Sequence, residues 1–105
     1  MKATFPALGL LAFTIAWAGP QAKPGDARAH FDRAKALYGK GDLDGAIAEL
    51  RQAIRLRPGF AEAHYGLGKA LDGKGDHKSA FTGYREAVRL KPDFPEAHLS
   101  LGGAL

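Results

Sequence analysis

Apolar and small residues recur every three to four positions through most of the chain, which is the spacing of one face of an α-helix. The stripe in residues 61–73 comprises Ala61, His64, Tyr65, Leu67, Gly68 and Leu71. A second stripe follows the break at residues 74–76 and comprises Ala80, Phe81, Tyr84, Ala87, Val88 and Leu90. The pattern predicts two amphipathic helices separated by a tight turn.

The residues at the predicted break and stop have the chemistry that ends and starts helices. Gly75 can take a positive φ and close the first helix, and Asp76 can cap the second. Pro92 ends the second helix because proline cannot continue the backbone hydrogen-bond ladder. The preceding segment has the same order of signals: Phe31, Ala34 and Leu37, then Gly41 and Asp42, then Ala46, Ile47, Leu50, Ala53 and Ile54, then Pro58.

The two helix pairs are copies of one unit. Aligning residues 27–60 with 61–94 gives 17 identities in 34 positions, and residues 95–105 match 61–71 at 7 of 11. Self-similarity at a fixed period of this length is the signature of a repeat architecture. We therefore expect an all-α chain with units at 27–60 and 61–94 and, at 95–105, the first helix of a third.

The repeat resembles the tetratricopeptide repeat family. The positions that carry the resemblance are Ala34, Leu37, Ala46, Leu50, Ala53 and Pro58 in the first unit and Leu67, Gly68, Leu71, Ala80, Tyr84, Ala87 and Pro92 in the second. The resemblance implies a right-handed α-solenoid of antiparallel helix pairs with about 2.3 repeats. Small residues at these positions let the two helices approach to about 8–10 Å.

Two features depart from a full array of repeats. Arg33 stands where the family usually has leucine, which fits a solvent-facing terminal repeat. The sequence given ends at Leu105, within the predicted first helix of a third unit. Because about three repeats are normally needed to bury a continuous core, we expect low stability, or stabilisation by a partner or by self-association. The alternative is a truncated fragment of a longer repeat protein with no independent binding activity.

The N-terminal segment has the pattern of a secretory signal peptide. Lys2 precedes an apolar stretch over residues 7–17, and these 11 residues suit the apolar region of a signal peptide, whereas a membrane-spanning helix needs about 20. Small residues fit cleavage after Ala18. We expect residues 1–18 to direct export to the periplasm or the exterior, with an uncleaved membrane anchor as the alternative. Residues 19–26, with two prolines and two glycines, predict a linker.

Composition and charge narrow the chemistry. The absence of cysteine excludes disulfides, thiolate metal sites and a cysteine nucleophile. The net charge of +4 is a mild basic bias. Several cations lie in the last turns of the predicted second helices, where they complement the helix dipole: Arg51, Arg55, Arg57, Arg85, Arg89 and Lys91. Acidic residues are interleaved with them and no aromatic stacking set accompanies them, so we expect no nucleic-acid partner.

No group of residues predicts catalysis or a cofactor. The sequence of residues 68–75 nearly matches the motif of a phosphate-binding loop. Its last position is a glycine, so the hydroxyl that would reach magnesium is missing, and no predicted strand precedes it. His30, His64 and His98 occupy one position of successive repeats, which favours core or half-buried packing over metal binding. The carboxylates Asp42, Asp44, Asp72 and Asp76 cluster at turns, where capping accounts for them. We expect no enzyme activity, no cofactor and no metal.

The expected function is therefore recognition. The resemblance implies a concave groove faced by residues of the first helices: Phe31, Lys35, Tyr38, Tyr65, Lys69, Asp72 and Leu99. Phe31 and Tyr65 are aligned aromatics with a lysine four residues further on, an arrangement that can hold a peptide segment, although packing between adjacent repeats explains the two aromatics equally well. Residues that clamp a peptide carboxylate in some family members are replaced here by Phe31, Gly66, Glu96 and Ser100. The sequence predicts an exported adaptor that binds another protein.

Overall fold

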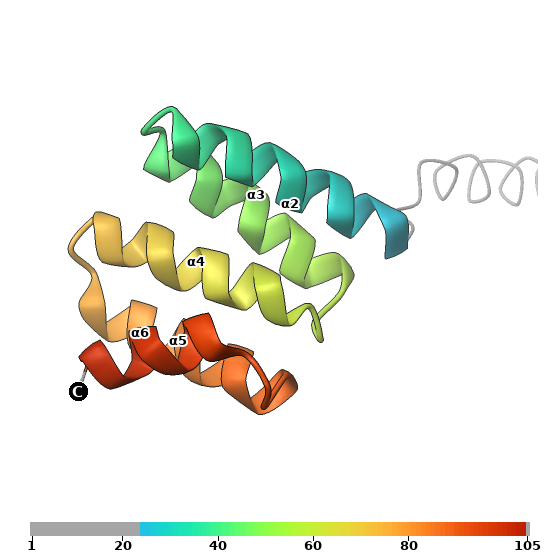
Figure 1. The fold of residues 1–105 in the computed structure, drawn as a ribbon. Coiled ribbons are helices and arrows are strands. Elements are labelled where there is room, and N and C mark those ends of the chain that lie inside the picture. The colour runs from blue at the N-terminus through green and yellow to red at the C-terminus, as the bar shows by residue number, and fades with distance from the viewer. Residues whose placement is uncertain (1–23, 105) are drawn as a thin grey trace, which may run out of the picture.

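The computed structural model describes residues 24–104, and this part of the chain consists of five α-helices without a strand (Figure 1). In chain order they are α2 (Pro24–Gly39), α3 (Leu43–Leu56), α4 (Ala61–Gly73), α5 (His77–Leu90) and α6 (Pro95–Ala104). The all-α fold of antiparallel helix pairs is confirmed. None of the helices in the described residues is long and apolar enough to cross a membrane.

Each hairpin turns at the glycine and aspartate that the sequence singles out. Gly41 and Gly75 have positive φ values of 86° and 91°, a region that a side chain disfavours. Asp42 then accepts a hydrogen bond from the Gly45 N–H at 2.9 Å, and Asp76 accepts one from the Ser79 N–H at 3.2 Å. These caps satisfy N–H groups that have no partner within their own helix.

The helices stack because small residues line their contacts. Helix α2 packs on α3 and α4 on α5, while α3–α4 and α5–α6 contacts join successive units. Ala34, Ala46 and Ala80 are all at most 1% exposed. The backbones of α4 and α5 approach closely in the second hairpin, where a Cβ added to Gly83 would lie 3.2 Å from the Cα of Gly68. The short side chains therefore set how closely α4 and α5 pack.

Two phenylalanines close the junctions between units. Phe60 follows the turn after α3 and is 1% exposed, and Phe94 follows the turn after α5 and is 7% exposed. Phe60 belongs to the core shared by α2, α3, α4 and α5. Phe94 packs with Ala61, Ala87 and Ala97, which fixes the start of α6 against the second unit.

The structure differs from the sequence-based expectations at both ends of the described residues. Helix α2 begins at Pro24, so the last three residues of the predicted linker 19–26 are helical. Proline suits a first helical position because an N–H there has no partner, and Asp26 in the first turn complements the helix dipole. The signal segment 1–18 lies outside the described residues.

At the other end, α6 has no partner helix in the described part of the chain. A Cβ added to Gly102 would meet nothing within 4 Å, so this small residue makes no close helix contact. His98 is exposed, and the expectation of half-buried packing is wrong for it, whereas His30 and His64 are half-buried. The two half-buried histidines are those whose helix is followed by the second helix of its pair in the described residues.

Candidate functional site

Two adjoining hollows lie along the first helices of the units. The smaller, of about 300 Å³, is lined by Phe31, Ala34, Lys35, Tyr38, Leu50, Tyr65, Gly66 and Lys69. The larger, of about 740 Å³, is lined by Tyr38, Tyr65, Lys69, Asp72, Gly73, His77, Tyr84, Ser100 and Gly103. Tyr38, Tyr65 and Lys69 line both. We call the two hollows together the groove, and the smaller of them the α2–α4 pocket.

The groove brings together six of the seven residues that the sequence predicts for it. Phe31, Lys35 and Tyr38 come from α2, and Tyr65, Lys69 and Asp72 from α4. Leu99 lines neither hollow and is 81% exposed. On α6 the residues that reach the groove are Ser100 and Gly103 instead.

The aligned aromatics Phe31 and Tyr65 pack between units as well as line the groove. The ring centroid of Phe31 lies 5.0 Å from that of Phe60, and the ring of Tyr65 lies 5.1 Å from that of Phe94. The two pairs occupy equivalent repeat positions and have similar tilted geometry, which is favourable for aromatic rings. Both aromatics are half-buried. The two sequence-based interpretations of Phe31 and Tyr65 thus describe different faces of the same rings.

The two lysines of the groove lie over aromatic rings. Lys35 Nζ is 5.6 Å from the centroid of Phe31. Lys69 Nζ is 5.1 Å from the centroid of Tyr38 and 5.6 Å from that of Tyr65, so it lies between rings of α2 and α4. Such cation–π contacts orient an ammonium group without neutralising its charge. Within residues 24–104 neither lysine has a carboxylate partner.

A cluster at the far end of the larger hollow holds Asp72 as an anion. The Tyr84 hydroxyl donates to Asp72 Oδ2 at 3.1 Å, and His77 Nδ1 contacts Asp72 Oδ1. The hydrogen bond from His77, aided by that from Tyr84, lowers the pKa of Asp72. Burial, together with the Asp72 carboxylate, raises the pKa of Tyr84. Sequence reasoning missed this cluster because its members come from two helices, Asp72 from α4 and His77 and Tyr84 from α5.

The three aligned histidines make hydrogen bonds rather than a shared site. Nε2 of His64 lies 3.0 Å from the Pro58 carbonyl oxygen, and Nε2 of His98 lies 2.7 Å from that of Pro92. A ring N–H donating to the carbonyl ties each helix start to the turn before it. In the described residues, no three side chains of histidine, aspartate or glutamate converge as a metal site would require.

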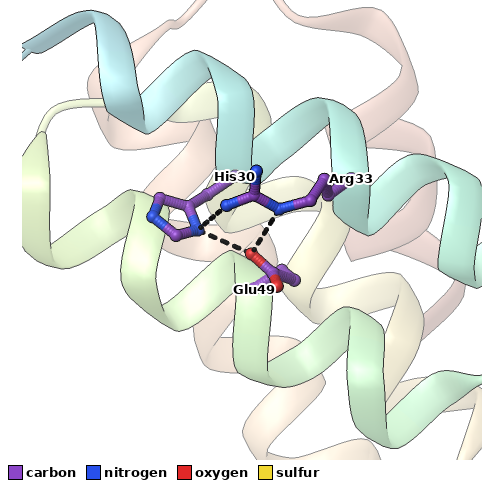
Figure 2. Close-up of polar contacts among 3 residues, drawn as sticks. All are labelled: His30, Arg33 and Glu49. Atoms are coloured by element: carbon purple, nitrogen blue, oxygen red, sulfur yellow. Dashed lines mark hydrogen bonds and ion pairs between the residues drawn. The ribbon is translucent and has the colours of Figure 1, made fainter.

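The first of these histidines, His30, has another partner. Figure 2 shows His30 of α2 facing Glu49 of α3, with the Arg33 guanidinium beside both. His30 Nδ1 lies 2.6 Å from Glu49 Oε1 and therefore donates to the carboxylate, which leaves it no lone pair for the Arg33 Nη2 at 3.0 Å. The His30 hydrogen bond, aided by the charge of Arg33, lowers the pKa of Glu49.

Comparison with known proteins places the repeats in a family. Residues 34–75 match the family model described as TPR repeat, and residues 61–94 match the model described as Tetratricopeptide repeat. No curated protein gives a significant match.

Solved structures give a similar result. A structure titled "Crystal structure of MamA" is 33% identical with a TM-score of 0.73, over 74% of this chain and 46% of that one. A second, titled "Crystal structure of MamA protein", is 33% identical with a TM-score of 0.72, over 74% of this chain and 43% of that one. The chain therefore spans less than half the length of these relatives.

Proposed function

The chain belongs to the tetratricopeptide-repeat family, a protein-interaction fold, and from that premise we propose that it is an adaptor that binds another protein in the groove along α2 and α4. Binding involves no covalent step and no cofactor. It depends on shape and charge complementarity on a helical surface that is formed before the partner arrives.

The observation that carries this proposal is the arrangement around Lys69. Its ammonium group lies between the rings of Tyr38 and Tyr65, and all three residues line both hollows of the groove. Tyrosine is one of the residue types that dominate binding energy at protein interfaces, and the ammonium group adds charge complementarity for an acidic partner. Tyr38 is 39% exposed, so much of its ring is available to a partner.

The proposal includes export. The support is the pattern of residues 1–18, with Lys2, an apolar stretch and small residues before position 19. N-terminal sequencing of the protein recovered from cells that express the complete gene tests this: a chain that begins at Gly19 supports cleavage after Ala18. A chain that still begins at Met1 and sediments with membranes contradicts it and favours the uncleaved anchor.

The binding function is tested by capture on the immobilised protein from an extract of the cells that make it. Lys69→Glu reverses the charge at the centre of the groove. The matched control Lys78→Glu makes the same change at an exposed residue of α5 that itself lines neither hollow. We expect a protein that is retained by wild type and by Lys78→Glu and lost with Lys69→Glu. Equal retention by all three would contradict the assignment of the groove.

A further inference from the structure

We infer that the α2–α4 pocket receives one bulky apolar side chain of a partner peptide, and that Lys35 and Lys69 pair with carboxylates next to that side chain. This inference rests on the proposed function and names the chemistry of the partner at one place in the groove.

The inner surface of the pocket is apolar. Leu50 and Ala34 line it and are 3% and 1% exposed, so they belong to the core of the first unit. The half-buried rings of Phe31 and Tyr65 line it as well. Its volume of about 300 Å³ is at the small end of ligand pockets, which span roughly 300–1,000 Å³. An apolar space of this size suits a single large side chain.

Gly66 keeps this space open. A Cβ added to Gly66 would lie 3.3 Å from Leu50 Cδ2 and 3.8 Å from Phe31 Cε1, so any side chain there would enter the pocket. Glycine is a poor residue for the interior of a helix. The repeat does not require it, because Asp32 and Ser100 occupy the equivalent positions in the other units. The absence of a side chain at Gly66 therefore lets α4 lie close to Leu50 and leaves the space of the pocket free.

The charge around the pocket is positive and uncompensated. Lys35 and Lys69 line it without a carboxylate partner in the described residues. The nearby carboxylates are occupied, since Asp32 pairs with Arg28 at 3.5 Å and Asp72 is bonded to His77 and Tyr84. A partner that buries an apolar group beside two free ammonium groups gains most when it supplies carboxylates.

The apolar stretch of this chain itself does not fit that requirement. Residues 3–18 contain no charged residue, and the first carboxylate side chain in the sequence is that of Asp26. The chemistry of the pocket thus favours a separate, acidic peptide over residues 7–17 of the same chain.

A library of random twelve-residue peptides displayed on phage tests the inference, with the full chain as the immobilised target. We expect enriched sequences in which a phenylalanine, leucine, methionine or tryptophan lies next to aspartate or glutamate. Lys69→Glu should change the preference at one flanking position from acidic to basic while the position next to Lys35 stays acidic, and this gain of a new preference shows that the variant is folded. The control Lys78→Glu should keep the wild-type preference.

The most enriched peptide is then synthesised with a fluorescent label and its affinity measured. Gly66→Val should weaken binding by about tenfold or more, and Gly66→Ala should weaken it in the same direction with helicity unchanged. The matched control Gly102→Ala, in a helix but with open space around it, should bind as wild type does. Replacing the apolar residue of the peptide by serine should have an effect similar to that of Gly66→Val.

The outcomes separate this inference from the proposed function. Enriched peptides that lack the apolar–acidic pattern, yet lose binding with Tyr38→Ala, would overturn the inference and leave the groove as a binding site. An absence of any enrichment would count against both. Self-association of the wild-type chain that Gly66→Val abolishes would assign the pocket to a second copy and would also overturn the inference.

Discussion

The ring of Phe60 lies 5.0 Å from that of Phe31 and is tilted by 44° to it. Phe60 is the last residue of the first unit and stands directly before α4, whereas Phe31 lies in the first helix of the first unit, so this contact joins α2 to the start of the second unit. The equivalent pair, Tyr65 and Phe94, joins the second unit to α6 at 5.1 Å. Phe31 and Tyr65, which line the groove, thus also pack against Phe60 and Phe94.

Removal of the Phe60 ring should destabilise the fold strongly. Phe60 is the largest side chain with less than 2% exposure among the described residues, and Phe→Ala changes in cores cost about 3–5 kcal/mol. We expect Phe60→Ala to lower the free energy of unfolding by that amount, as measured by urea denaturation followed by circular dichroism. Leu99→Ala, at a residue that is 81% exposed, serves as the control and should change it by less than about 0.5 kcal/mol. If Phe60→Ala lowers the free energy of unfolding no more than Leu99→Ala does, the Phe60 ring does not hold the units together.

The contact between α4 and α5 should not tolerate a methyl group at Gly68. A Cβ there would lie 2.6 Å from Cε1 of Tyr84, which is only 2% exposed and cannot move aside. Gly68→Ala should therefore cost about 1–3 kcal/mol through overpacking, although alanine is the better helix former. In contrast, Gly102→Ala should be neutral or stabilising, by up to about 1 kcal/mol. Thermal unfolding of the two variants in parallel checks the sign of each change, and a stabilised Gly68→Ala would contradict the observed helix packing.

The pair of His30 and Glu49 should make stability depend on pH in the acid range. Because the folded state lowers the pKa of Glu49, the carboxylate stabilises the fold at pH values above its unfolded pKa. That contribution is lost as the pH falls through the folded pKa. We expect Glu49→Gln to reduce stability near pH 7 by about 0.5 kcal/mol, since the side chain is 26% exposed.

The difference between Glu49→Gln and wild type should shrink as the pH falls below about 4. Urea titrations between pH 3 and pH 7 measure it. Glu96→Gln removes an exposed carboxylate of α6 and should give a curve parallel to that of wild type. A constant difference for Glu49→Gln across the range would show that the ion pair contributes nothing.

The cleanest single substitution in the groove is Tyr38→Ala. Phe31→Ala and Tyr65→Ala would remove rings that join the units, so a loss of binding in those variants would mix with a loss of stability. Tyr38 is 39% exposed, and the centroid of its ring lies 5.1 Å from Lys69 Nζ. We expect Tyr38→Ala to weaken binding of a captured partner by about 1–3 kcal/mol in isothermal titration, with an unfolding curve close to that of wild type. If Tyr38→Ala binds the partner as tightly as wild type does, Tyr38 is not part of the interface.

The scaffold could be predicted from sequence because its signals are local. Gly41, Gly75, Asp42 and Asp76 adopt the turn and cap roles that their chemistry indicates. The small residues at repeat positions lie where helices touch, because a 34-residue period fixes which faces meet. Helix α2 begins earlier than the sequence predicts, since a segment rich in proline and glycine indicates a linker while proline also suits the first turn of a helix.

Two groups of side-chain contacts between helices could not be predicted, since these contacts have no equivalents in the other unit. Asp72, His77 and Tyr84 align with Tyr38, Leu43 and Leu50 in the first unit. The repeat pattern therefore does not predict that these three side chains form a cluster. The His30–Glu49 contact likewise has no equivalent, because Gly83 occupies the position of Glu49 in the second unit. The repeat position of Leu99 predicts that it faces the groove, but α6 lies at the end of the described helices and the Leu99 side chain is exposed to solvent.

Hydrogen–deuterium exchange of the protein with and without a captured partner tests the central claim most directly. The claim is that the partner lies along the first helices of the units. We predict added protection in α2 from Phe31 to Tyr38 and in α4 from Tyr65 to Asp72, with α3 and the exposed face of α5 unchanged. Protection confined to α3 and α5, with α2 and α4 unaffected, would contradict the account.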